Sequence, residues 1–520
     1  MTLPRHWIVA LILATTIGPN LLVMSGFMQI QTIIQNAFGS SSYATMWISI
    51  VANMAFAVWI PLGPVLSRQL GLRFCFRCAT VMFVVTFIAS SISDNTVLLG
   101  ISRALEGALT GTQLMVLVPL LFVEFPAERR NRVLGILLCI MFGSVVLGAI
   151  FGTISQAYDH WRWLFGLCAC LSMGALLLSG HLPKHMFPVP ATAAARGAWN
   201  RFDYMGMVLL FMLGISTIWW LGNLLPHGFS SPFVFVPAGV SLCLFACLIV
   251  VERSVTHPLV DFRLVTSRRS LCGAFVAILS NLLMLVAMSG MGFAMKTVSK
   301  IPSTTLPTVY GGLVISVGLA AILAASFFDR VGAGPLFIVG SLCIALSSYR
   351  LTSLEPGVSL DQLRFQLVLF SCGVGLNFVV GLVTCALGGP LNQLPRTMTV
   401  VQFLRVFFYT IVTPVSQWYL NVHTAILAAV NGWATTKVNT ITSASVTSGI
   451  QHDIASGESE QRARQIVMYL LSEELQSRAA LIATHHLFVI SFICSLCLLV
   501  ISCLTILLGK GPTVAHRSQT

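Results

Sequence analysis

The chain contains few charged side chains, and this shortage excludes most classes of protein. Only 9% of its 520 residues are Asp, Glu, Lys or Arg, whereas 56% are hydrophobic. Ordinary soluble domains carry about 25% charged residues, so the composition excludes a water-soluble globule. Acidic residues are the scarcer kind, with 16 Asp and Glu against 29 Lys and Arg, and the net charge is +13.

The chain also lacks the motifs of common soluble enzymes and of ATP-driven pumps. It has no phosphate-binding G-x-x-x-x-G-K-S/T and no zinc-binding H-E-x-x-H. Its 14 cysteines are scattered, mostly within apolar stretches, and imply no disulfide framework. We therefore expect neither an enzyme nor a protein that carries a cofactor or a metal ion.

The main feature of the sequence is instead a series of long apolar stretches. A membrane-spanning helix needs about 20 mainly apolar residues, and stretches of this kind recur along nearly the whole chain. The sequence therefore predicts an all-α integral membrane protein with fourteen spans. The predicted spans are 7–30, 44–66, 74–93, 97–123, 133–155, 162–182, 204–222, 232–251, 271–295, 306–327, 335–350, 364–388, 398–420 and 485–508.

The distribution of Lys and Arg predicts how these spans are oriented. If the N-terminus is cytoplasmic, the inward segments hold 18 of the 29 basic residues, and the short outward loops hold five. This is the positive-inside asymmetry, and an even number of spans then puts both termini in the cytoplasm. Orientation and contact with anionic lipid headgroups account for the positive net charge, so we expect a lipid bilayer and no nucleic acid as partner.

An internal repeat predicts the domain organisation. The turn after the second span, at 64–77, and the turn after the tenth, at 325–335, each contain a basic residue and a glycine. The two turns are equivalent if 1–182 and 264–520 are two six-helix halves, with two further spans inserted in 183–263. Six-span repeats related by an axis along the membrane normal are typical of transporters, whose binding site lies between the halves.

One ionisable pair lies deep within a predicted span. Of the 16 acidic residues, only Glu106 lies well inside an apolar stretch, one helical turn after Arg103. It lies about nine residues from the outer end of the span, hence roughly 14 Å deep at 1.5 Å per residue. Ionisable residues at such depth are costly and mark functional sites. We predict that Glu106 couples transport to protons, with a purely structural ion pair and direct substrate contact as the alternatives.

Several motifs, taken in order along the chain, resemble a known family. The segment from Phe125 to Phe165 contains FPAERRNRVLGI, then a helix with Gly143, Gly148 and Gly152, then DHWRWLF. Together with RALEG at 103–107, this order resembles the fourteen-span drug:proton antiporter family of the major facilitator superfamily. The resemblance implies a major-facilitator fold, an antiporter motif on the glycine-spaced helix, efflux of drug-like compounds and a location in the bacterial inner membrane.

The first span departs from the family pattern. The family has an Asp there, roughly two turns before a proline, whereas residues 21–35 contain neither. Glu106 is therefore the only well-placed carboxylate within the predicted spans for proton coupling. An uncoupled or uptake permease, and a membrane receptor without transport activity, are the alternative interpretations.

Other polar residues are candidates for the cavity and for gates. Lipid-facing amides are costly, so amides within the spans are expected to line a cavity. The candidates for lining the substrate cavity are Gln29, Gln31, Gln113 and Asn377. The candidates for gating charges are Arg129, Arg130, Asp329 and Arg330.

Arg405, in the thirteenth predicted span, has no acidic neighbour in that span. Its guanidinium would contact an anionic substrate, pair with Glu106 across the cavity, bond backbone carbonyls or extend to the cytoplasmic surface. The sequence leaves these four roles open.

The polar outward loop at 421–484 precedes the last span. Its second part has apolar residues at helical spacing with charges between them, which predicts an amphipathic helix. This segment would dock a periplasmic adaptor or cap the outer mouth, and the cap is the favoured prediction. We predict a transporter that exports a small amphipathic compound by alternating access, in exchange for protons.

Overall fold

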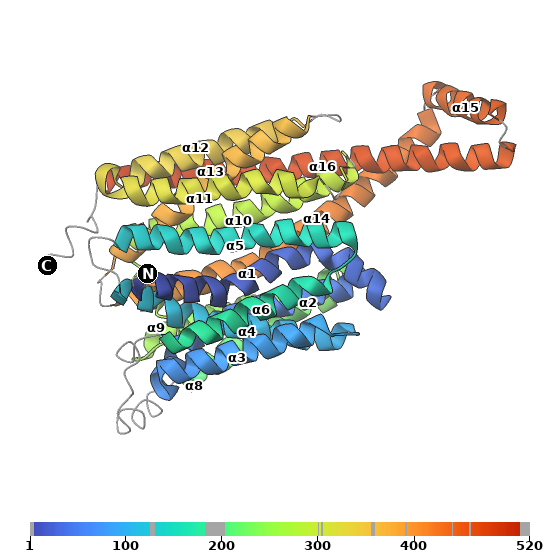
Figure 1. Cartoon of the computed structure of the whole chain (residues 1–520). Helices are drawn as coiled ribbons and strands as arrows, with labels where there is room; N and C mark the ends of the chain where they lie inside the picture. The colour runs from blue at the N-terminus through green and yellow to red at the C-terminus, as the bar shows by residue number, and fades with distance from the viewer. Residues whose placement is uncertain are drawn as a thin grey trace.

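The computed structural model describes residues 5–124, 130–181, 203–299, 301–302, 305–354, 359–389, 393–438, 440–456 and 459–509. Within these ranges the long elements are all α-helices, and no β-strand is present. A lipid-embedded backbone must satisfy its hydrogen bonds within each segment, which a helix does. The helices (Figure 1) are α1 (Arg5–Phe38), α2 (Ser42–Leu70), α3 (Leu72–Ser91), α4 (Thr96–Glu124), α5 (Arg130–Tyr158), α6 (Arg162–Leu178), α8 (Tyr204–His227), α9 (Pro232–Ser254), α10 (Arg268–Thr297), α11 (Leu306–Val331), α12 (Ala333–Leu351), α13 (Leu360–Leu387), α14 (Leu394–Val438), α15 (Thr440–Ala455) and α16 (Glu460–Leu507).

The helices agree with the predicted membrane spans. Among the described residues, eleven helices are long and apolar enough to cross a membrane. Two shorter apolar helices cover Gly143–Tyr158 and Arg162–Leu178. All fourteen predicted spans fall on helices, including the shortest, 335–350, which falls on α12. The all-α membrane fold is confirmed, and the count of fourteen spans stays a prediction.

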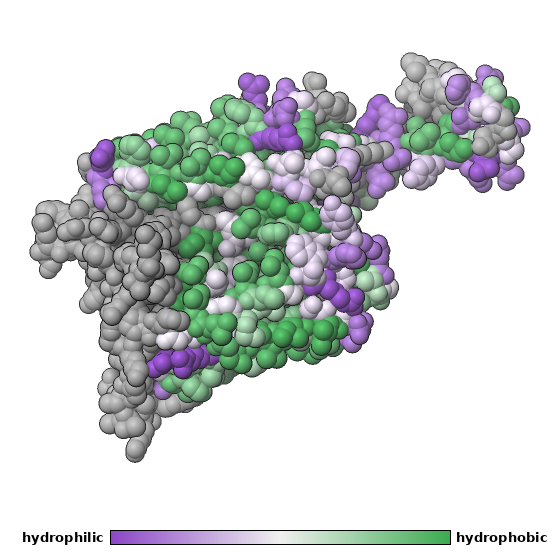
Figure 2. Space-filling view, viewed as in Figure 1, coloured by the Kyte–Doolittle hydropathy of each residue, from purple (hydrophilic) through white to green (hydrophobic). Residues whose placement is uncertain are grey.

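The surface of the bundle is apolar along its middle. Figure 2 shows hydrophobic side chains over the central part of the visible face, and hydrophilic ones at its right-hand end and on the projecting arm. On α9, the side chains of Phe235 and Leu242 are each 71% exposed. A contiguous apolar surface of this kind marks contact with a membrane, so lipid chains are expected to cover it.

Glycines allow α1 and α5 to approach closely. A Cβ at Gly148 would meet the backbone of Leu22, and one at Gly152 would lie 2.6 Å from the carbonyl oxygen of Gly26. Small residues permit such backbone contacts between membrane helices. Nothing lies within 4 Å of a Cβ at Gly143. Gly143 therefore makes no such contact. Gly148 and Gly152 are four residues apart and lie on one face of α5, whereas Gly143 is five residues before Gly148 and lies off that face.

Two groups of helices meet along a central layer. In Figure 1, α11, α12, α13 and α16 lie on one side of the bundle, and α2, α3, α4, α6 and α8 lie on the other. Across the layer, α5 packs on α11 and α2 packs on α14. The helix α8 packs on α9 and also contacts α2 and α14. The division into halves 1–182 and 264–520, with 183–263 inserted, stays a prediction.

An arm projects from one end of the bundle. Figure 1 shows that α14 and α16 continue beyond the other helices and that α15 lies at their tip. The helix α1 begins, and α16 ends, at the opposite end of the bundle. Leu427 and Ala483 still pack in one hydrophobic cluster with Val286 and Phe293 of α10. The described part of 421–484 beyond them extends away from the bundle and does not lie across it. The predicted outer cap is wrong for these residues, because the two helices continue along their own axes.

Candidate functional site

Two adjoining cavities lie among α1, α2, α10, α11 and α14. The outer cavity has a volume of about 360 Å³ and the inner one about 120 Å³. The outer cavity reaches Gln35 and Asn421, near the end of the bundle that carries the arm. Its volume falls in the range of about 300–1,000 Å³ that is usual for small-molecule sites. The two cavities share four lining side chains, which are Met24, Met28, Gln29 and Met288.

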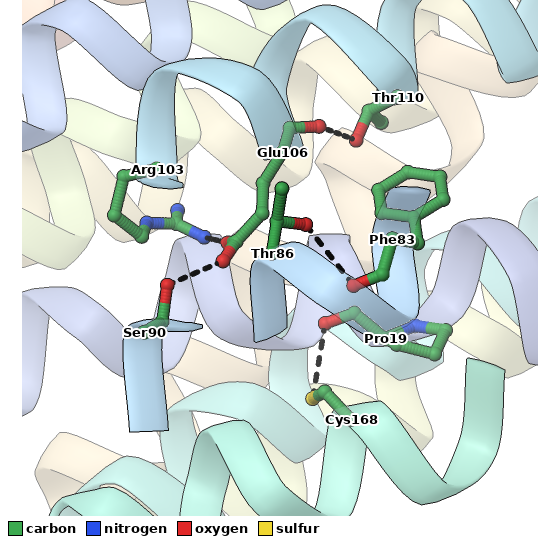
Figure 3. A network of polar contacts seen from close by, with 8 residues as sticks. All are labelled: Pro19, Phe83, Thr86, Ser90, Arg103, Glu106, Thr110 and Cys168. Carbon is green, nitrogen blue, oxygen red and sulfur yellow. Dashed lines mark hydrogen bonds and ion pairs between the residues drawn. The ribbon is translucent and has the colours of Figure 1, made fainter. Parts of the chain in front are cut away.

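The predicted ion pair lies on the wall of the outer cavity. On α4, Nη1 of Arg103 donates to Oε2 of Glu106, and both side chains are buried (Figure 3). Ser90 of α3 donates its hydroxyl to Oε1 of Glu106 at 2.7 Å. The Cζ atom of Arg103 also lies 5.5 Å from the centre of the Phe27 ring. The Glu106 carboxylate is thus held by one cation and one hydroxyl, on two neighbouring helices.

The two members of the pair differ in their access to the cavity. Arg103 lines the outer cavity, whereas Glu106 lines neither cavity and lies on the α3 side of Arg103. Among the described residues, Nε of Arg103 has no hydrogen-bond acceptor. A change in the charge of Glu106 would therefore act on the cavity through Arg103 and not by direct contact with a substrate.

Polar contacts around Glu106 fix the neighbouring helices. Thr110 donates to the backbone carbonyl of Glu106 at 2.7 Å, and Cys168 of α6 donates to the carbonyl of Pro19 at 3.4 Å (Figure 3). The first contact lies within α4, and the second joins α6 to α1 next to the pair.

Arg405 lines the inner cavity from α14. Its Nε donates to Oε1 of Gln402 at 2.7 Å, and its Cζ lies 5.5 Å from the centre of the Phe378 ring. Among the described residues it forms no ion pair, and Glu106 pairs with Arg103 instead. Of the roles that the sequence left open for Arg405, the pairing with Glu106 is therefore wrong.

Two of the predicted amides lie on the cavity and interact across helices. Gln29 lines both cavities and interacts with the buried Tyr310 of α11. Gln31 lines the outer cavity and donates to Oγ of Ser49 on α2 at 3.1 Å. Both side chains present polar atoms in a space that is otherwise rich in methionine.

The other two predicted amides lie away from the cavities. Gln113 donates to the carbonyl of Phe76 on α3 at 3.0 Å, and Asn377 donates to Oγ of Ser341 on α12 at 3.1 Å. Neither lines the outer or the inner cavity. The expectation that they face the substrate is wrong, because a buried amide is equally well satisfied between two packed helices.

Two of the four predicted gating charges, Asp329 and Arg330, lie on described residues at the end of α11. Arg330 is exposed in the last turn of α11, and Asp329 beside it is half-buried. Arg129 and the side chain of Arg130 lie outside the described residues. The gating role of all four stays a prediction.

Sequence reasoning missed two features of the site. Lys296, one residue beyond the predicted span 271–295, lies in the last turn of α10 and lines the outer cavity. Tyr409 of α14 lines the inner cavity and interacts with Asn53 of α2. The position of Lys296 within one turn of the end of a predicted span could have indicated the first feature. No sequence signal indicates the contact between Tyr409 and Asn53, because it joins helices far apart in the sequence.

Sequence reasoning also missed a second buried carboxylate. Glu252 of α9 is completely buried, and its Oε2 accepts the backbone N–H of Val260 at 3.1 Å. Glu252 lies outside the predicted span 232–251, so the prediction that only Glu106 lies well inside an apolar stretch is unaffected. Glu252 ends an apolar run and reads as a boundary residue, and only the fold of the following loop encloses it.

A multi-pass helix bundle with a cavity between its helices is the architecture of a membrane transporter. The model of the Major Facilitator Superfamily matches residues 11–413, and the chain belongs to that superfamily. It is therefore a transporter and not an enzyme, and the resemblance noted in the motifs is confirmed at this level.

Individual relatives agree with this assignment. The chain is 31% identical over 409 residues to the uncharacterized MFS-type transporter YubD of Bacillus subtilis (strain 168), covering 79% of each chain. It is 24% identical over 400 residues to the multidrug export protein EmrB of Haemophilus influenzae, covering 74% of this chain and 75% of that protein. A crystal structure of the peptide transporter POT in complex with sulfate superposes with a TM-score of 0.60 at 15% identity, covering 97% and 96% of the two chains. That similarity shows the fold alone.

Proposed function

We propose that this protein is a secondary transporter of the bacterial inner membrane, with both termini in the cytoplasm. It exports a small amphipathic compound by alternating access, in exchange for protons. The observation that carries the proposal is the buried Arg103–Glu106 pair, in which one member lines the cavity. The similarity to a protein named for multidrug export supports the direction of transport.

The pair has the chemistry that proton exchange requires. A carrier of this kind needs a group that takes up a proton when the site faces one side and releases it on the other. Protonation of Glu106 would remove the negative charge that holds Arg103, and the freed guanidinium would change the potential of the cavity. Reorientation of the helices around the cavity would then expose Glu106 to the opposite side. The close α1–α5 contact at Gly148 and Gly152 permits such motion between neighbouring helices.

A test uses purified protein in liposomes with an imposed pH gradient. The probes are three fluorescent amphiphiles of different charge: anilinonaphthalene sulfonate, N-phenylnaphthylamine and ethidium. We expect flux of at least one probe, its arrest when the gradient is collapsed, and a proton flux in the opposite direction. In Glu106→Gln the proton flux should be lost, while Ser91→Ala should retain it, since Ser91 is a half-buried neighbour of Ser90 whose hydroxyl donates to the carbonyl of Arg162 and not to Glu106. Full proton coupling in Glu106→Gln would overturn the role of this residue.

A second candidate, an uncoupled permease, is favoured by one observation. The helix α1 contains no Asp or Glu, although it lines both cavities. In that case the probe would move down its own gradient at the same rate with and without a pH gradient, and Glu106→Gln would leave the rate unchanged.

We further propose that the arm formed by α15 and the outer parts of α14 and α16 contacts a periplasmic partner. The arm extends beyond the bundle and carries exposed apolar side chains such as Met468 and Tyr469. Replacing residues 440–456 with a short Gly/Ser linker should abolish complex formation with the partner and leave flux in liposomes intact. Loss of flux in liposomes would instead indicate that the arm acts within the transporter itself.

A further inference from the structure

The charged side chains on the two cavities are all basic. Arg103 and Lys296 line the outer cavity, and Arg405 lines the inner one. Among the described residues, no Asp or Glu lines either cavity. A cleft lined by one sign of charge within low-dielectric walls concentrates ligands of the opposite sign.

We propose that the cavities carry an amphipathic organic anion, whose anionic group is bound by Arg405 in the inner cavity and by Lys296 in the outer one. The inference rests on the proposed transport function and names the substrate class of the same site.

Lys296 and Arg405 carry the positive charge that is available to a substrate. The charge of Arg103 is already neutralised by Glu106. Among the described residues, neither Lys296 nor Arg405 has an acidic partner. Arg405 uses Nε for Gln402, and no acceptor among those residues contacts its two terminal nitrogens. These terminal nitrogens form the fork that binds a carboxylate, sulfonate or phosphate through two hydrogen bonds.

The two cations lie at different depths of one path. On α14, Arg405 lines the inner cavity, and Gln417, twelve residues later, lines the outer one, which is roughly 18 Å along the helix. Lys296 lies in the last turn of α10, is exposed and lines the outer cavity. An anion that leaves Arg405 in the outward direction therefore meets a second cation near the mouth.

The walls between the two cations suit an apolar body of variable shape. The side chains of Met24, Met28 and Met288 line both cavities, and those of Met46 and Met284 line one each. Methionine is unbranched and polarisable, so a methionine surface adapts to different apolar shapes. The amide of Gln29, on both cavities, adds a neutral hydrogen-bonding group that does not discriminate by charge.

The experiment compares two probes that share one apolar framework. Anilinonaphthalene sulfonate carries a permanent negative charge, and N-phenylnaphthylamine has the same rings without the sulfonate. Binding to the detergent-purified protein and flux from liposomes are measured for wild type, for Lys296→Gln and Arg405→Gln singly and combined, and for Arg478→Gln. Arg478 of α16 is exposed and lines neither cavity, so Arg478→Gln removes one positive charge outside them.

We expect wild type to bind the sulfonate about tenfold more tightly than the neutral amine, since a hydrogen bond to a charged group is worth about that factor. Lys296→Gln and Arg405→Gln should each remove one of the two sulfonate-binding positions, and the double variant should lose about tenfold in affinity for the sulfonate and nothing for the amine. Arg478→Gln should match wild type for both probes. An inside-negative membrane potential should accelerate export of the sulfonate from liposomes more than that of the amine, because exchange of an anion for a proton moves one more charge across the membrane than exchange of a neutral molecule.

Three results would separate the inference from the proposed function. Equal affinity of wild type for the two probes, or preferred binding of ethidium, overturns the anionic substrate class while transport stands. Equal losses of sulfonate binding in Arg478→Gln and in the cavity variants overturn the assignment to Lys296 and Arg405. Charge-dependent binding of the sulfonate without flux of any probe supports the anion site and overturns export.

Discussion

Two buried carboxylates in this protein have opposite surroundings. Glu106 of α4 receives hydrogen bonds from Arg103 and Ser90, and both of its oxygens have a donor. Glu252 of α9 faces another acid: its Oε1 and Oδ2 of Asp203 each lie 2.5 Å from the point that a Gly206 Cβ would occupy. Among the described residues, neither of these two oxygens has a donor.

The difference indicates which carboxylate is suited to act in transport. Glu106 is bound to a cation that itself lines the cavity, so a change of its charge is transmitted to the substrate space. Glu252 binds the N–H of Val260, and Asp203 caps α8 by accepting the N–H of Gly206 at 2.8 Å. Glu252 and Asp203 therefore act through these backbone N–H groups, which lie in the loop after α9 and at the start of α8. Two facing carboxylates without a cation are not both ionised at low cost.

The largest expected effect separates the two sites. Glu106→Gln leaves the buried Arg103 without its counter-charge, and breaking a buried ion pair on one side costs about 3–5 kcal/mol of unfolding free energy. We expect a strongly lowered Tm of the purified protein in detergent. The double variant Arg103→Gln, Glu106→Gln removes both charges and should recover much of the loss. A Tm equal to wild type in Glu106→Gln would show that Arg103 has another counter-charge.

A second expected effect concerns the space between Asp203 and Glu252. Gly206→Ala introduces a methyl group at 2.5 Å from both carboxylate oxygens and should cost about 1–3 kcal/mol by overpacking. Gly239→Ala on α9 is the matched control, because nothing lies within 4 Å of a Cβ there. The comparison of the two Tm values is the measurement. Equal Tm values would mean that the two acids are not held together.

A smaller effect is expected from the hydroxyl beside Glu106. Ser90→Ala removes one hydrogen bond to the carboxylate and keeps the ion pair, which should lower the unfolding free energy by about 1–2 kcal/mol. The Tm of this variant should fall between those of wild type and Glu106→Gln. A loss as large as that of Glu106→Gln would assign the stability to the hydroxyl and not to the cation.

The smallest effect is expected at Glu252 itself. In Glu252→Gln the amide can donate a hydrogen bond to Asp203, so the unfolding free energy should change by less than about 1 kcal/mol, or rise. Flux and proton coupling should equal those of wild type. A fall in Tm like that of Glu106→Gln would mean that Glu252 is ionised and paired with a cation, and the contrast between the two sites would disappear.

Much of the fold could be predicted from the sequence, because a backbone segment that crosses lipid must satisfy its own hydrogen bonds and therefore forms a helix. Apolar stretches of spanning length predicted the helices, and all fourteen stretches fall on helices. The depth of Glu106 and its spacing from Arg103 predicted the ion pair, because residues three apart lie on one helix face. Gln29 and Gln31 were expected to line the cavity because an amide is costly to expose to lipid, and both do line it.

The failed predictions share a physical cause. Gln113 and Asn377 are amides within apolar spans, as Gln29 is, but they donate hydrogen bonds to a carbonyl of α3 and a hydroxyl of α12. Which face of a helix meets a cavity, and which meets another helix, depends on how helices far apart in the sequence pack. No local spacing in the chain reports that packing.

The sequence by itself determined the membrane class, the positions of the helices and the Arg103–Glu106 contact, since each depends only on apolar length or on spacing within one helix. The tertiary structure alone decided that Arg103 lines the cavity while Glu106 lies behind it. It also brought Lys296 and Arg405 to one path, and Asp203 to Glu252. These arrangements join different helices, and helix–helix contacts in a membrane are set by the shape of whole faces and not by any single stretch of sequence.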